Sequence, residues 1–233
     1  MDILKEISNI GIIPVIKIND ASKAVPLAKA LIDGGLAAAE VTFRTDAAEE
    51  AIRAISEAFP DMIVGAGTVL TIDQAQRALN AGAKFIVSPG FNPKVVKWCL
   101  EQGVTPLPGI NTPSEIEQAL ELGLKVVKFF PAEQSGGLAK IKAMSAPYGG
   151  VKFMPTGGIN TENVCEYLAS NKILACGGSF MVKESYIDNG NWDEITALTK
   201  KAVELMLGLE IAHIGINNAK FSFQFPCQPF GVL

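Results

Sequence analysis

Short apolar runs rich in β-branched residues alternate with amphipathic stretches along most of this 233-residue chain. Eight runs have the character of strands: IIPVIK (12–17), AAAEVTF (37–43), MIVGAG (62–67), KFIVSP (84–89), VTPLPG (104–109), LKVVKFF (124–130), VKFMPTG (151–157) and KILACGG (172–178). Strands separated by helices of about 10–15 residues indicate a parallel sheet. Eight such units within roughly 200 residues fit a closed (β/α)8 barrel, the TIM-barrel architecture, better than an open doubly wound sheet. We therefore predict one barrel domain over residues 1–208.

The stretches between these runs carry signals for helix starts and helix ends. The predicted starts are Asp20, Thr45–Asp46, Thr71, Asn92–Pro93, Thr112–Pro113 and Asn160–Thr161, and the predicted ends are Gly34–Gly35, Gly82, Gly103 and Gly123. Ser, Thr, Asp and Asn satisfy the unpaired N–H groups of a first turn, proline fits that turn, and glycine adopts the left-handed conformation at a helix end. In barrels of this kind the chemistry lies at the carboxyl ends of the strands, so we look for site residues there.

Composition narrows the classes of function. The chain has 20 basic and 24 acidic residues with no run of like charge, which argues against nucleic acid or an anionic membrane as a partner. No apolar segment approaches the roughly 20 residues of a membrane span, and we expect a cytoplasmic protein. The four cysteines are scattered, which indicates reduced thiols, with Cys99 and Cys176 buried. The only histidine is His213, so a histidine metal cage or a Ser–His–Asp triad cannot form within the barrel.

A lysine interrupts one of the apolar runs. Lys128 lies between Val126–Val127 and Phe129–Phe130, in a run typical of a strand buried on both faces. Strand alternation places Lys128 on the inward face, and in AAAEVTFR it places Glu40, Thr42 and Arg44 on one inward face as well. Such residues need partners, because an unpaired buried charge is costly.

Two interpretations of this lysine stay open from the residues alone. One is a structural ion pair between Lys128 and Glu40. In the other, burial and a neighbouring cation, Arg44, disfavour the charged form of Lys128, and a neutral amine attacks ketones to form a Schiff base.

Two glycine pairs follow the last two predicted strands. PTGGINTEN (155–163) joins the seventh strand to a helix start, and CGGS (176–179) follows the eighth. Loops at these two places form the usual phosphate site of the architecture, and Ser179 adds a hydroxyl donor. No GxxxxGK(S/T) loop occurs, which disfavours nucleotide triphosphate chemistry.

Seven blocks together resemble a known enzyme family. They are EVTFRT (40–45), VGAGTVL (64–70), IVSPGFNP (86–93), LPGINTPSE (107–115), KFFPAE (128–133), PTGGI (155–159) and GGS (177–179), in order and at fitting spacing between about residues 5 and 207. They are similar to the signature blocks of the bacterial 2-keto-3-deoxy-6-phosphogluconate aldolases, which are also active as 4-hydroxy-2-oxoglutarate aldolases.

The resemblance implies a class I aldolase and a role for each matching residue. Lys128 would be the Schiff-base lysine and Glu40 would shuttle protons. Arg44 and Thr68 would hold the pyruvate carboxylate. The remaining assignments are Pro89 and Phe130 as pocket walls, and Thr156, Gly157, Gly158, Gly178 and Ser179 as the phosphate site. The family is usually a homotrimer that acts on a small ketoacid without metal or cofactor; it often has arginine where this chain has Lys17, so a phosphate contact from Lys17 stays open.

Residues 209–233 depart from the family pattern. We treat LEIAHIGINNAKFSFQFPCQPFGVL as a C-terminal extension of unknown role, a remnant of a fused domain or a packing arm. IAHIGIN faintly resembles the first strand of a metal-binding glyoxalase-type domain, but too little chain follows for the rest of one. Two other functions compete with the aldolase: a sugar-phosphate isomerase or epimerase with Glu40 as base, and a non-catalytic oligomeric barrel.

Overall fold

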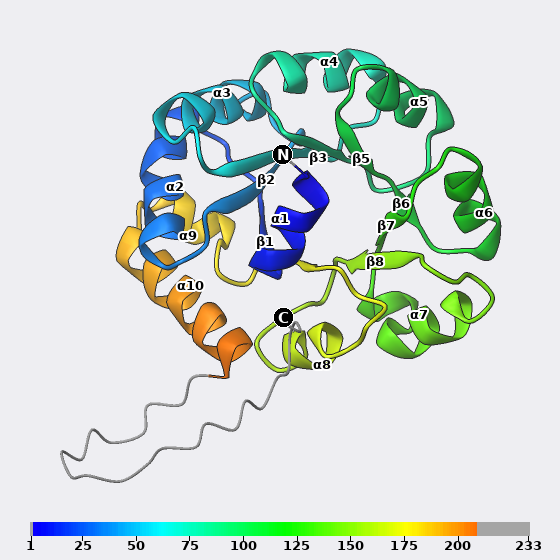
Figure 1. Cartoon of the computed structure of the whole chain (residues 1–233). Helices are drawn as coiled ribbons and strands as arrows, with labels where there is room; N and C mark the ends of the chain where they lie inside the picture. Colours follow the sequence, from blue (N-terminus) through cyan, green and yellow to red (C-terminus); the bar gives the residue numbers. More distant parts are fainter. Residues whose placement is uncertain (1, 209–233) are drawn as a thin grey trace, which may run out of the picture.

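The computed structural model describes residues 2–208, and its strands are all parallel (Figure 1). The strands are β1 (Ile12–Ile16), β2 (Ala38–Thr42), β3 (Ile63–Gly67), β4 (Phe85–Val87), β5 (Thr105–Leu107), β6 (Gly109–Ile110), β7 (Val126–Phe129), β8 (Lys152–Pro155) and β9 (Cys176–Gly178). Six of them form one sheet in the order β5-β4-β3-β2-β1-β9, and three form another in the order β6-β7-β8. The predicted α/β fold with parallel strands is thereby confirmed.

The two sheets approach each other at both of their edges. At one edge β5 and β6 are separated only by Pro108, so the predicted strand 104–109 is interrupted there. Proline lacks the N–H that a strand ladder needs. At the other edge two isolated parallel bridges, Phe153 with Ile173 and Thr156 with Gly177, connect β8 to the segment around β9.

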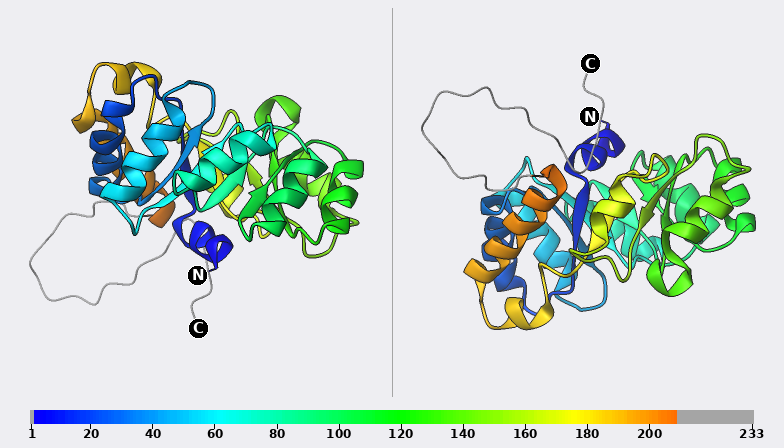
Figure 2. Two further views of the ribbon diagram at one scale, coloured as in Figure 1. Left: turned by 90° about the horizontal axis from the view of Figure 1, so that it is seen from above. Right: turned by 90° about the horizontal axis from the view of Figure 1, so that it is seen from below.

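Helices surround the curved sheets on the outside (Figures 1 and 2). They are α1 (Ile3–Ile10), α2 (Ala24–Asp33), α3 (Ala48–Ala58), α4 (Ile72–Asn80), α5 (Pro93–Glu101), α6 (Pro113–Glu121), α7 (Gly137–Ser145), α8 (Val164–Leu168), α9 (Glu184–Asp188) and α10 (Trp192–Leu207), with 3-10 turns η1 (Ala21–Lys23) and η2 (Glu133–Ser135). Helix α1 differs from the rest because it lies across the centre of the ring at one end (Figures 1 and 2).

Most of the predicted helix starts are correct. The confirmed side-chain caps are Asp20, which caps η1, Thr71, Asn92 and Thr112, which forms a capping box with Glu115. The start at Thr45–Asp46 is wrong: α3 begins at Ala48, and the Thr45 hydroxyl instead donates to the Ile18 carbonyl at 2.5 Å. The start at Asn160 is early, because Asn160 accepts from Glu162 N in a turn that precedes α8.

Two apolar clusters fill the molecule. The larger lies between strands and helices and includes Ala39 and Val41 of β2. The smaller, which we call the inner core, takes alternate residues of the strands and two residues of α1: Ile3, Ile7, Ile13, Ala38, Ile63, Phe85, Val87, Leu107, Val126, Met154, Leu174 and Ala175. Thus α1 and the inner core close one end of the ring.

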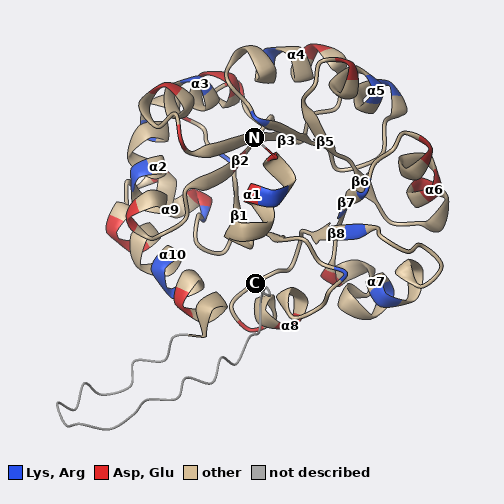
Figure 3. Cartoon of the chain, viewed as in Figure 1, with Lys and Arg blue, Asp and Glu red and all other residues tan. Residues whose placement is uncertain are grey.

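Charged side chains lie mainly on the surrounding helices, with both signs interspersed (Figure 3). Among residues 2–208, no helix is both long enough and apolar enough to cross a membrane. Cys99 and Cys176 are buried, as predicted. The predicted extension 209–233, with His213, lies outside the described residues.

Candidate functional site

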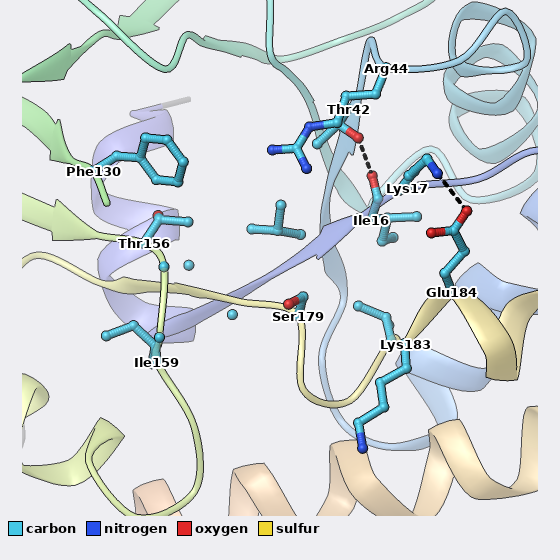
Figure 4. A pocket seen from close by; sticks show the side chains of 16 residues that line it. Ile16, Lys17, Thr42, Arg44, Phe130, Thr156, Ile159, Ser179, Lys183 and Glu184 are labelled. Carbon is cyan, nitrogen blue, oxygen red and sulfur yellow. Dashed lines mark hydrogen bonds and ion pairs between the residues drawn. The ribbon is translucent and has the colours of Figure 1, made fainter. Parts of the chain in front are cut away.

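A cavity of about 430 Å³ opens at the carboxyl ends of β1, β8 and β9 (Figure 4). Its walls combine the two predicted glycine loops with residues that follow β1, β2, β7 and β9: Val15, Ile16, Lys17, Thr42, Arg44, Phe130, Thr156, Gly157, Gly158, Ile159, Gly177, Gly178, Ser179, Val182, Lys183 and Glu184. The cavity therefore lies where the architecture places its chemistry.

A buried ion pair lies beside Phe130 of the cavity wall, and neither of its members lines the cavity. Lys128 Nζ lies 3.3 Å from Glu40 Oε1, and the two residues are 5% and 0% exposed. The Phe130 ring, which lines the cavity, has its centroid 5.3 Å from Lys128 Nζ. The inward orientation that strand alternation predicts for Lys128 and Glu40 is confirmed.

Glycine at position 67 makes room for the carboxylate of this pair. A Cβ on Gly67 would lie 2.7 Å from Glu40 Cγ and 2.8 Å from Glu40 Cδ, closer than real Cβ atoms approach. Glu40 Oε2 is buried, and within the described part of the protein it has no hydrogen-bond partner. Such a group costs free energy unless it meets a donor, which suits it to a substrate hydroxyl or a water.

Arg44 follows the end of β2, and its side chain points into the cavity (Figure 4). Unlike Lys128 and Glu40, it is exposed and not buried. Its Nε donates to Thr68 Oγ1 at 3.1 Å, which brings together the two predicted carboxylate ligands. Thr68 has a φ of +55°, a strained conformation for a β-branched residue and one that recurs at functional sites.

The two glycine loops meet as predicted. Gly157 and Gly158 have φ values of +99° and +80°, which side chains rarely adopt. Thr156 Oγ1 is buried and, within residues 2–208, has no hydrogen-bond partner. A Cβ on Gly177 would overlap this oxygen, so glycine at 177 permits the close approach of the loops. Gly178 and Ser179 complete this wall.

Pro89 stands apart from the cavity lining. It is half-buried, and its carbonyl packs so closely on Gly109 that no side chain fits at position 109. Lys183 and Glu184 of the lining were not predicted, because the glycine signal of the last loop ends at Ser179, and the role of Lys17 was open. Lys17 Nζ pairs with Glu184 Oε1 at 2.6 Å (Figure 4).

Within residues 2–208, no group of three or more His, Cys, Asp or Glu side chains could hold a metal ion.

Comparison with known proteins places this site in a family. The family model for KDPG and KHG aldolase matches residues 3–198. The chain is 50% identical over 204 residues to the 2-dehydro-3-deoxy-phosphogluconate aldolase of Treponema pallidum, covering 88% of this chain and 97% of that one. It is 44% identical over 193 residues to the KHG/KDPG aldolase of Escherichia coli K12, covering 83% and 91% of the two chains.

A solved structure agrees in fold. The KDPG aldolase of Legionella pneumophila, in which pyruvate was captured at low pH as a covalent carbinolamine intermediate, superposes with a TM-score of 0.82 at 39% identity, over 85% of this chain and 97% of that one. The chain belongs to the KDPG and KHG aldolase family. The predicted family, and with it the predicted class of enzyme, an aldolase, is confirmed.

Proposed function

We propose that this protein cleaves 2-keto-3-deoxy-6-phosphogluconate to pyruvate and glyceraldehyde 3-phosphate, or 4-hydroxy-2-oxoglutarate to pyruvate and glyoxylate, through a Schiff base on Lys128. The observation that carries the proposal is the buried amine of Lys128, 3.3 Å from the carboxylate of Glu40 and 5.3 Å from the centroid of the Phe130 ring, which lines the cavity. The two relatives, a 2-dehydro-3-deoxy-phosphogluconate aldolase and a KHG/KDPG aldolase, support both substrates.

The first step joins the amine to the substrate. A neutral Lys128 attacks the carbon-2 ketone, and loss of water from the resulting carbinolamine gives an iminium. Formation of the neutral amine requires a proton acceptor, and Glu40 lies within reach. Glu40 then returns this proton to the carbinolamine hydroxyl, which leaves as water, so Glu40 is a carboxylate again before the second step. The burial of Lys128 and its contact with the Phe130 ring exclude bulk water from the amine.

The second step breaks the bond between carbon 3 and carbon 4. Glu40, directly or through a water, takes the proton of the carbon-4 hydroxyl, the aldehyde leaves, and the bonding electrons enter the iminium to form an enamine. Return of a proton to carbon 3 and hydrolysis of the imine release pyruvate and regenerate Lys128. Glu40 Oε2, buried without a partner among the described residues, is the oxygen suited to the hydroxyl.

The two ends of the substrate are held separately in this proposal. Arg44 donates from Nε to Thr68, and among residues 2–208 its two Nη groups have no hydrogen-bond partner, so both can bind the pyruvate carboxylate. At the other end, the phosphate accepts from the N–H groups of the glycine loops and from the hydroxyls of Thr156 and Ser179. Phe130 forms a wall between the ends, and Pro89 shapes the pocket from outside the cavity lining, where its carbonyl packs against Gly109.

Borohydride trapping tests the proposal. After incubation with pyruvate and borohydride, mass spectrometry is expected to find a reduced adduct on Lys128, and Lys128→Met is expected to lose both the adduct and aldol cleavage. Turnover that survives borohydride and Lys128→Met would instead support an isomerase or epimerase with Glu40 as base. A folded wild type with neither adduct nor turnover would support the non-catalytic barrel.

We also infer that the two sheets form a single closed (β/α)8 barrel. Counting β5 and β6 as one interrupted strand gives the eight predicted strands, and the bridges between β8 and the β9 segment support closure at the other edge. A single catalytic domain over residues 1–208, assembly as a homotrimer and a cytoplasmic location stay predictions from the family resemblance and the composition.

A further inference from the structure

An ion pair lies on the cavity wall at the phosphate end. Lys17 Nζ is 2.6 Å from Glu184 Oε1, and Asn19 Nδ2 donates to the same oxygen at 2.7 Å. The Lys17 and Glu184 side chains are 40% and 42% exposed, and both line the cavity together with the glycine loops. A carboxylate therefore stands where the proposed substrate brings a phosphate.

The position of Lys17 follows from the strand order. Lys17 comes directly after β1, and β1 pairs with β9 so that Pro14 lies opposite Gly178. The end of β1 thus lies beside the loop that contains Ser179. Figure 4 shows the amine of the other cavity lysine, Lys183, directed away from Ser179, and its Nζ lies 5.5 Å from the centroid of the Tyr186 ring. Lys17 is accordingly the amine best placed to meet an anion at this end.

We infer that Glu184 competes with the phosphate group of the substrate for Lys17, and that residue 184 thereby sets how strongly the cavity prefers a phosphorylated ketoacid. This inference rests on the proposed function for the identity of the anion. An entering phosphate must separate Lys17 from Glu184 before it can pair with the amine, and it also approaches a carboxylate of its own sign. Hydrogen bonds from Lys17 and then Asn19 lower the pKa of Glu184, so this carboxylate is ionised at neutral pH.

Binding of inorganic phosphate, measured by calorimetry at constant pH and low ionic strength, tests the inference. Glu184→Gln removes the competitor and is expected to tighten phosphate binding by about three- to tenfold, the range for one exposed pair plus one repulsion across water. Asp193→Asn is the matched control, since it removes one negative charge from the next helix, α10, at an exposed residue that does not line the cavity. It is expected to change the dissociation constant by less than about twofold.

A double substitution separates competition from simple repulsion. Lys17→Met is expected to weaken phosphate binding. In the Lys17→Met background, Glu184→Gln should change the logarithm of the phosphate dissociation constant by less than half as much as it does in the wild type. An equal gain in both backgrounds, an equal effect of Asp193→Asn, or no phosphate binding in either wild type or Glu184→Gln would overturn the inference.

Catalysis provides a second measurement. Glu184→Gln is expected to lower KM for the phosphorylated ketoacid with little change in kcat. For the exchange of pyruvate methyl protons with solvent, which involves no phosphate, KM and kcat are both expected to stay unchanged. Because phosphate binding requires no turnover, tighter binding in Glu184→Gln without a borohydride adduct on Lys128 would reject the proposed chemistry and keep the competition for the anion.

Discussion

Substituting Gly67 by alanine should strongly lower activity although neither Lys128 nor Glu40 is itself substituted. The backbone at Gly67 has no positive φ, so alanine meets no conformational penalty there. Its Cβ, however, would lie 2.7 Å from Glu40 Cγ and 2.8 Å from Cδ. Glu40 is fully buried and cannot turn into solvent, so the carboxylate must leave its place 3.3 Å from Lys128.

Two magnitudes follow from this displacement. Forcing a methyl group into a filled interior costs about 1–3 kcal/mol of the free energy of unfolding. Loss of a positioned general base lowers kcat by about 10²- to 10⁴-fold. We expect both effects in Gly67→Ala: a moderate loss of stability in urea unfolding, and a large loss of kcat in a coupled assay of pyruvate release.

Gly65→Ala separates the two effects. Gly65 lies on the same strand, and a Cβ there would overlap the Phe85 ring, with Cε1 at 2.5 Å. It should therefore cost a similar free energy of unfolding while leaving Glu40 in place. If folded Gly67→Ala retained a kcat within about threefold of Gly65→Ala, the placement of Glu40 would not govern the chemistry and this reasoning would fail.

Three further predictions concern the ion pair, the phosphate site and a buried thiol. Lys128→Met should lower the free energy of unfolding by about 3–5 kcal/mol, because it leaves Glu40 buried and unpaired, and Lys128→Met/Glu40→Met should restore most of that loss in urea unfolding. Ser179→Ala should raise KM about tenfold for the phosphorylated ketoacid through loss of one charge-assisted hydrogen bond, while the unphosphorylated ketoacid keeps its KM; equal effects on both would remove Ser179 from the phosphate site. Burial raises the pKa of Cys99 to about 11, so its thiol stays protonated at neutral pH, and peptide mapping should find it unlabelled by iodoacetamide in the native protein and labelled in urea.

The inward pair could be predicted from the sequence because strand alternation is a local property. Lys128 is flanked by apolar residues on β7, and Glu40 shares its parity with Ala38 of the inner core. Because the parallel strands curve around a common centre, parity decides that both residues point there. The α/β fold followed in the same way, from the spacing of strands and the capping signals between them.

Arg44 and Glu184 show where local patterns stop. The alternation that places Glu40 inward ends with β2 at Thr42, so Arg44 leaves the strand geometry and its side chain is exposed at the rim. Glu184 reaches Lys17 across 167 positions of sequence, and only the pairing of β1 with β9 brings them together. This contact produces no periodic pattern in the sequence, and neither does the space that Gly67 leaves for Glu40. Neither feature could therefore be predicted from the sequence.

The inner core explains how one strand can hold an amine both dry and accessible. On β7, Val126 and Lys128 face the same side, two residues apart, and Val126 belongs to the apolar layer that α1 closes from below. Water is therefore excluded from that end of the ring, and in the proposed function substrate arrives from the cavity at the carboxyl ends of the strands. Burying the Lys128 side chain disfavours folding, and the apolar burial of the adjacent inner core offsets this cost. The proposed Schiff-base chemistry can therefore take place only at the carboxyl ends of the strands, because α1 and the inner core fill the other end.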